Sequence, residues 1–298
     1  RRSGGDPRPC RSSSSGRWRR TSLTGAIAVQ ICELRQSLLD CRGHALVLGG
    51  PGSGKTTIAL KKAVVRINGG LDAGQSVLFL SFSRAAVARL GEAMKQEVPK
   101  AQRSQLSMQT FHSFFWTLLS AHGYLLGAPR KLRILLPQDE QVEYGSIKPR
   151  ERNVQNADWR AWLARREEMF RQDGRIAFDL FARNAEALLI RSQHIRRLIT
   201  QRHPLIIVDE AQDTDAHAWR CIELLSATAQ IVCLADLDQQ IFDYLPGIGP
   251  ERVDAIRQTL TPLEIDLGGQ NHRSGGTEIA VFGQDILVGR ARGAPYAG

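Results

Sequence analysis

The sequence lacks long hydrophobic runs. Apolar stretches such as 45–48 and 205–208 are far shorter than the about 20 residues that a helix needs to cross a bilayer. This excludes a membrane protein. The basic residues at the N-terminus are not followed by an apolar stretch of about 7 to 15 residues, so they do not form a secretory signal.

Cysteine is scarce and its spacing is irregular. The five cysteines stand at positions 10, 32, 41, 221 and 233, with no C-x-x-C pair and no histidine at zinc-finger spacing. An odd and scattered set is typical of reduced thiols in a cytoplasmic protein. We therefore expect neither a metal–sulfur site nor a disulfide.

Strong compositional bias is absent, apart from one segment. The 298 residues are 42% hydrophobic and 23% charged, which excludes a wholly disordered or fibrous protein and leaves room for about two domains. Of the net charge of +10, residues 1–20 carry +6, from seven Arg and Asp6. This Ser-rich tail predicts a disordered leader, with a nucleic-acid-binding arm as the alternative. The absence of an initiating Met favours a fragment.

Short apolar strands alternate with helical patterns in two blocks of the sequence. Strands are expected at 45–48, 76–81, 205–208 and 231–234, and helices at 27–39, 56–65 and 85–95. This alternation predicts an α/β fold with a parallel sheet covered on both faces. Residues 113–203 instead show helical spacing and eleven Arg after position 151, which predicts an all-helical insertion. Its Arg faces are interpreted as solvated surface, with a path for DNA as the alternative.

A glycine-rich segment follows the first strand. Residues 49–56, GGPGSGKT, fit the pattern G-x-x-x-x-G-K-[ST] between a strand and a helix, which is the context that the motif needs. The glycines let main-chain N–H groups converge on phosphate oxygens at a helix N-terminus. Lys55 would neutralise the β- and γ-phosphates and Thr56 would bind Mg²⁺. The expected nucleotide site comprises Gly49, Gly50, Pro51, Gly52, Ser53, Gly54, Lys55, Thr56 and Thr57.

Two acids follow the apolar strand at 205–208. Parallel strands of such sheets end at the ligand-binding edge, so Asp209 and Glu210 are expected beside the phosphate loop. Asp209 suits the shell of Mg²⁺, and Glu210 is placed to orient or deprotonate the attacking water. Together with the phosphate loop, they predict a complete site for hydrolysis of a nucleoside triphosphate.

Residues 209–213, DEAQD, together with the phosphate loop resemble the UvrD/Rep group of superfamily 1 DNA helicases. Further segments match motifs of that group in order: SFSRAA at 81–86, TFHSF at 110–114, ADLDQQIF at 235–242 and NHRS at 271–274. The resemblance covers residues 43–275. It implies a RecA-like P-loop NTPase that uses ATP and Mg²⁺ and acts on single-stranded DNA.

The resemblance also implies roles for single residues. Gln239 would sense the γ-phosphate, and Arg273, contributed by a second motor domain, would stabilise charge on the transferring phosphoryl group. Contacts with single-stranded DNA, by base stacking or by hydrogen bonds to the backbone, are implied for Phe82, Tyr244, Thr110 and His112. The alternatives are a surface amide, a surface arginine, core aromatics and, for His112, a helix cap.

The sequence departs from the group's pattern in places. Arg84 stands where the group has Asn, and His272 stands where it has an aromatic residue. Gln30 and Gln36 both fit poorly the pattern of the glutamine that reads adenine. The chain stops about 25 residues after the last motif, so we expect a truncated second motor domain.

These observations predict a domain order and a function. We expect a basic tail at 1–20, a first RecA-like domain at 21–112 and 204–266, the helical insertion at 113–203 and the start of a second RecA-like domain at 267–298. The expected function is an ATP-dependent DNA helicase or translocase whose missing domain is supplied by downstream sequence or by another chain. The alternative is an NTP-gated single-stranded nucleic-acid binding module without unwinding activity.

Overall fold

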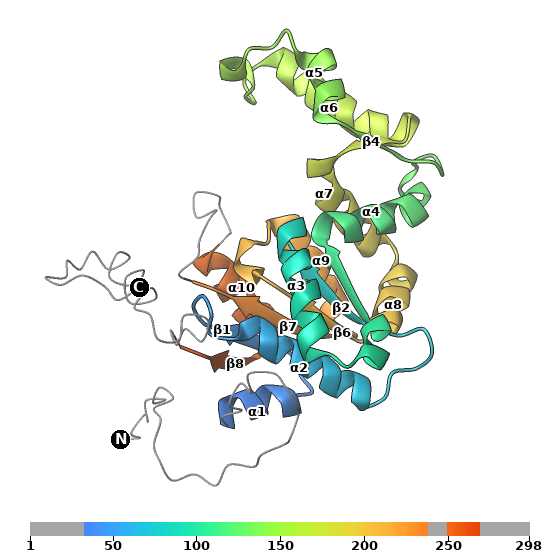
Figure 1. Cartoon of the computed structure of the whole chain (residues 1–298). Coiled ribbons are helices and arrows are strands. Elements are labelled where there is room, and N and C mark those ends of the chain that lie inside the picture. The colour runs from blue at the N-terminus through green and yellow to red at the C-terminus, as the bar shows by residue number, and fades with distance from the viewer. Residues whose placement is uncertain (1–32, 238–248, 269–298) are drawn as a thin grey trace, which may run out of the picture.

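A six-stranded parallel sheet forms the centre of the computed structural model, which describes residues 33–237 and 249–268 (Figure 1). The strand order is β3-β2-β6-β7-β1-β8, and every pairing is parallel. The predicted parallel α/β fold is therefore confirmed. The strands are β1 (Ala45–Leu48), β2 (Val77–Ser81), β3 (Leu106–Thr110), β6 (Leu205–Val208), β7 (Gln230–Ala235) and β8 (Leu263–Asp266).

The four inner strands are the ones that the sequence predicts. The two edge strands, β3 and β8, were not expected, because neither is an apolar run: β3 reads LSMQT and β8 reads LEID. In β3 only Leu106 is buried, and in β8 only Ile265. An edge strand is covered less completely than a central one, so its sequence carries a weaker hydrophobic signal.

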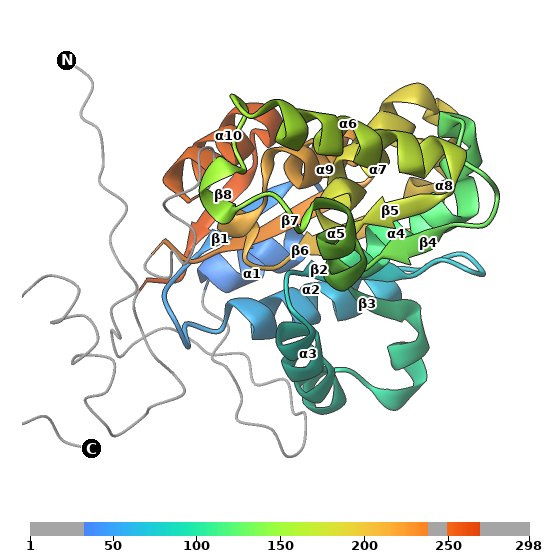
Figure 2. The same ribbon diagram turned by 90° about the horizontal axis from the view of Figure 1, so that it is seen from above.

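Helices cover both faces of the sheet (Figure 2). One face packs against α1 (Glu33–Asp40), α2 (Lys55–Asn68) and α3 (Arg84–Glu97) through residues such as Val47 and Phe79. The other face packs through residues such as Leu46 and Leu78 against a second set of helices. These are α4 (Phe111–His122), α7 (Phe181–Arg191), α8 (Gln193–Arg202), α9 (Ala216–Ser226) and α10 (Pro250–Leu260). Among the described residues, no helix is both long enough and apolar enough to span a bilayer.

The insertion is mainly helical but contains a small second sheet. Strands β4 (Arg133–Leu135) and β5 (Arg175–Ala177) pair in parallel, so the expectation of a wholly helical insertion is wrong in this detail. Strands of three residues are too short to show a period of two. With α5 (Pro137–Tyr144) and α6 (Ala157–Gln172), they form what we call the distal lobe, residues 133–177, away from the main sheet (Figure 1). Its own core consists of Leu135, Trp162, Met169 and Ala177.

Candidate nucleotide site

The glycine-rich loop between β1 and α2 has a conformation that only glycine adopts without strain. Gly52 and Gly54 have φ angles of 76° and 90°, in the left-handed region that L side chains rarely enter. A Cβ atom added at Gly49 would lie 2.6 Å from Ser53 Oγ, which is closer than real Cβ contacts. The loop therefore brings its main chain to the N-terminus of α2 without side chains in the way.

The loop also fits the phosphates of a nucleotide. The Ser53 side chain is 1% exposed, and its hydroxyl has no hydrogen-bond partner among the described residues. Buried polar groups are normally hydrogen-bonded, so this donor suits an anionic ligand. Arg35 on α1 supports the loop from behind, since its Nη2 donates to the Ser53 carbonyl oxygen at 3.1 Å. Local sequence patterns give no signal for this contact of Arg35.

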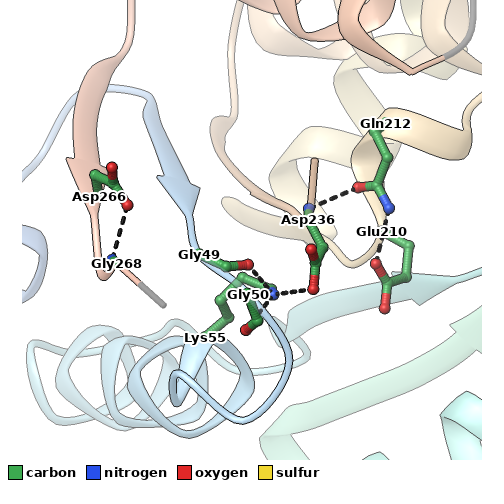
Figure 3. Close-up of polar contacts among 8 residues, drawn as sticks. All are labelled: Gly49, Gly50, Lys55, Glu210, Gln212, Asp236, Asp266 and Gly268. Carbon is green, nitrogen blue, oxygen red and sulfur yellow. Dashed lines mark hydrogen bonds and ion pairs between the residues drawn. The ribbon is translucent and has the colours of Figure 1, made fainter. Parts of the chain in front are cut away.

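Lys55 is the first residue of α2, and its ammonium group is held in place (Figure 3). It donates to the carbonyl oxygens of Gly49 and, at 3.1 Å, Gly50. It also pairs with Asp236 at the end of β7, with 3.0 Å between Nζ and Oδ2. The lysine side chain is 10% exposed and the aspartate 2%. The predicted phosphate-binding cation thus lies at the mouth of the loop.

Asp209 and Glu210 follow β6, which pairs with β2 on one side and with β7 on the other. Asp209 is buried, and its main-chain N–H donates to Leu80 at 2.9 Å. Burial, together with the charge of Glu210, raises the pKa of Asp209 to about 7, against the opposing effect of Lys55. A divalent cation would favour the charged form of this carboxylate. Thr56 and Asp209 are the residues that would hold Mg²⁺.

Glu210 is half-buried and has a strained main chain. Its φ of 50° is in the left-handed region, one of two such non-glycine residues among the described ranges. A residue persists there only where its surroundings fix it, and such residues cluster at functional sites. Its Oε2 atom accepts a hydrogen bond from Gln212 Nε2 at 2.9 Å (Figure 3). The carboxylate that the sequence predicts as the base is thus oriented by a neighbouring amide.

Gln212 lies in the motif DEAQD and Asp236 in the motif ADLDQQIF, yet no role was predicted for either. Gln212 is fully buried and its Oε1 accepts the main-chain N–H of Asp236 at 3.1 Å. Asp236 then reaches Lys55, so two motifs far apart in sequence meet at the phosphate loop. The signal that would have found them is their place inside the motifs, but their contacts depend on the packing of β6 against β7.

Three of the four residues expected to contact DNA line a separate cavity at the same edge of the sheet. Phe82, Thr110 and His112 line a cavity of about 690 Å³, together with Trp116 and Phe178. Phe82 directly follows β2, and its ring lies 5.0 Å from that of Phe111. The Thr110 hydroxyl accepts from Ser113 N at 3.1 Å and so caps α4. The cap foreseen as an alternative role for His112 is therefore made by Thr110.

Some predicted site residues lie outside the described residues. Gln239 and Tyr244 fall in 238–248, and Arg273 falls in 269–298. Their roles stay predictions. Gln36 is described, and its Nε2 donates to Asp40 at 3.0 Å on the exposed side of α1.

The fold and the site define a P-loop NTPase domain: a parallel sheet, a glycine-rich loop before α2, and acids at the ends of β6 and β7. The chain belongs to the AAA domain family, whose model matches residues 40–244. The resemblance to the UvrD/Rep group of superfamily 1 helicases is confirmed.

Three curated relatives support that resemblance. The chain is 23% identical to the ATP-dependent DNA helicase YjcD of Bacillus subtilis, with 90% of this chain and 39% of that protein covered. It is 22% identical to the ATP-dependent DNA helicase Rep of Escherichia coli, with 81% and 41% covered. It is 23% identical to the DNA helicase II of E. coli, with 80% and 38% covered. The chain thus spans about 40% of the length of these relatives.

Proposed function

We propose that this chain hydrolyses ATP with Mg²⁺ and couples the hydrolysis to movement on single-stranded DNA. The observation that carries the proposal is the meeting of the phosphate loop, the Lys55–Asp236 pair and Glu210 at one edge of the sheet. The names of the relatives, ATP-dependent DNA helicases, support the choice of ATP and DNA.

The roles in hydrolysis follow from position. The main chain of residues 49–54 and the Lys55 ammonium would bind the phosphates, and Thr56 with Asp209 would hold Mg²⁺, which supplies charge that neutralises the phosphates. Glu210 would orient the attacking water and accept its proton. As the resemblance implies, Gln239 would sense the γ-phosphate and Arg273 would stabilise the charge on the phosphoryl group as it is transferred.

The cavity beside β2 and β3 supports binding of single-stranded nucleic acid. It joins an aromatic ring at the end of β2, Phe82, with aromatic rings of the insertion, Trp116 and Phe178. Aromatic rings bind the bases of a single strand by stacking, worth about 1–3 kcal/mol per base. The cavity lies at the same edge of the sheet as Asp209, since β2 and β6 are neighbours. A displacement at the nucleotide site would therefore be transmitted to the cavity through the adjacent strands β6 and β2.

One experiment tests the coupling. ATP hydrolysis by the purified chain is measured with and without oligo(dT), and oligo(dT) affinity is measured by fluorescence anisotropy. Phe82→Leu keeps apolar packing but removes the stacking face, so we expect affinity to fall about 5- to 150-fold. Tyr124→Leu is the matched control, because Tyr124 is an aromatic residue, 40% exposed, outside the cavity.

The outcomes separate the two candidate functions. Hydrolysis that rises with oligo(dT), and a Phe82→Leu variant that loses this rise, would support a DNA-dependent motor. Nucleotide-controlled binding of oligo(dT) with no turnover would instead support the binding module. Hydrolysis indifferent to oligo(dT), with equal affinities for both variants, would contradict the proposed DNA site.

A further inference from the structure

Gln212 makes hydrogen bonds to three different parts of the fold. Its Oε1 accepts from the main chain of Asp236, at the end of β7, and its Nε2 donates to Glu210, after β6. Its main-chain oxygen accepts from the N–H of Gly249, directly before α10, at 2.8 Å. The side chain is fully buried. A buried glutamine with both ends bonded fixes the groups that it joins, because breaking either bond leaves a buried polar group without a partner.

These contacts form one continuous series from the phosphate-binding cation to the expected base (Figure 3). Lys55 binds the Asp236 carboxylate, Gln212 binds the Asp236 main chain, and the same amide binds Glu210. A single side chain therefore sets the position of Glu210 relative to Lys55. Local geometry does not do so, since Lys55 begins the helix after β1, Glu210 follows β6, and β7 lies between these two strands.

The strained main chain of Glu210 explains why the hydrogen bond from the Gln212 amide matters. A non-glycine residue at a φ of 50° needs external contacts to stay there. Two are present: the Gln212 amide on the Glu210 carboxylate, and the Asp213 main-chain N–H, which donates to the Glu210 carbonyl oxygen at 2.9 Å. The second holds the main chain, and the first holds the side chain.

We propose that Gln212 is a positioning residue that holds the Glu210 carboxylate in register with the Lys55–Asp236 pair, so that turnover depends on it while nucleotide capture does not. The inference rests on the proposed function, in which Glu210 is the base. Glutamine suits this place because it combines an acceptor for the Asp236 N–H with a donor for the carboxylate. Misplacing a catalytic group by about 1 Å can cost about 100-fold in rate.

The first test separates binding from turnover. Gln212→Met keeps the length and apolar volume of the side chain but removes both hydrogen bonds. We expect kcat to fall about 10- to 100-fold, while the Kd for a fluorescent ATP analogue with Mg²⁺ changes less than about threefold. The matched control is Gln230→Met, at the other end of β7, where the amide donates to the carbonyl oxygens of Cys41 and Gly43. The control should leave both quantities unchanged.

A second test needs no hydrolysis. Glu210→Gln, Gln212→Glu and the double variant form a cycle measured by urea unfolding of the full chain. Gln212→Glu alone places two carboxyl groups against each other, whereas the double variant restores an amide facing a carboxylate with the partners exchanged. We expect the double variant to be more stable than the two single effects predict when summed. Its turnover stays low, because position 210 then lacks a base.

The outcomes distinguish the inference from the proposed function. If the wild-type chain does not hydrolyse ATP, the proposed function fails, and the unfolding cycle still decides whether Gln212 holds Glu210. Additive effects in the cycle would overturn the inference. So would equal losses of affinity and turnover in Gln212→Met, because such a pattern would show a general structural role. If Gln212→Met does not fold, the cycle and the kcat of Gln212→Glu carry the test.

Discussion

The nucleotide site and the distal lobe differ in the groups that hold them together. At the site, Lys55, Asp236 and Gln212 are almost wholly buried and bonded to one another. The lobe also has a buried ion pair, Arg166–Glu140, but its Arg165–Glu168 pair is exposed, and exposed pairs contribute about 0–1 kcal/mol each. The lobe depends instead on a core of a few buried side chains.

This difference predicts which property a substitution should change in each region. At the site, a substitution of a polar group alters binding or chemistry while the sheet, with its two large apolar cores, stays folded. In the lobe, the loss of one large apolar residue removes much of the core. Four variants, in order of decreasing effect, test whether the site and the lobe respond in these different ways.

Glu210→Gln should have the largest effect. The substitution keeps the shape of the side chain, and its carbonyl oxygen still accepts from Gln212, but the base is lost. Since a positioned base contributes about 10²- to 10⁴-fold, kcat should fall by that factor with ATP binding retained. Single-turnover hydrolysis and analogue binding measure the two quantities. Equal turnover in variant and wild type would move the base to another residue.

Trp162→Ala should affect the lobe alone. Trp162 is 6% exposed and lies in the lobe core with Tyr144 against its ring, and such truncations cost about 3–5 kcal/mol. Hydrogen exchange followed by mass spectrometry should show lost protection in α5 and α6 and unchanged protection in α2. Loss of protection throughout the sheet would mean that lobe and sheet unfold as one unit, which would break the comparison.

Lys55→Ala should weaken nucleotide binding with little effect on folding. It removes a cation whose bonds to phosphate are of the charge-assisted kind, worth about 1.5–3 kcal/mol, so affinity should fall about 10- to 150-fold. Lys61→Ala, on the same helix but paired with Glu97 at 4.0 Å, is the matched control. Fluorescent analogue titration measures both. An unchanged affinity in Lys55→Ala would contradict the site assignment.

Asp213→Asn should have the smallest effect, confined to the pH dependence of stability. Burial, with the charges of Glu210 and Asp236, raises the pKa of Asp213 to about 6. The folded chain therefore binds this proton more tightly than the unfolded chain. The resulting contribution to the free energy of unfolding is fully present below about pH 4 and is lost as the pH rises to about 6. The free energy of unfolding, measured with urea from pH 4 to 7.5, should decline less steeply with pH in the variant than in the wild type. Asp254→Asn, an exposed carboxylate, should leave the slope unchanged.

Much of the site could be predicted from the sequence because its motifs are local. The loop at 49–56 and the acids after Val208 each need only a strand followed by a turn, and the structure places both at one sheet edge. Thr110 was predicted as a DNA contact, which stays a prediction, and the structure shows that it caps α4. The edge strands β3 and β8 were missed, since their burial comes from a single neighbouring strand.

By itself, the sequence determined the apolar alternation of the inner strands and the glycines of the phosphate loop, because steric limits and burial act on neighbouring residues. Which distant groups meet depends on how the strands pack side by side. Asp236 reaches Lys55, and Gln212 bridges Asp236 to Glu210, because β7 packs between β1 and β6. No local pattern specifies such contacts, since they arise from strand order, and strand order is set by the burial of both faces of the whole sheet.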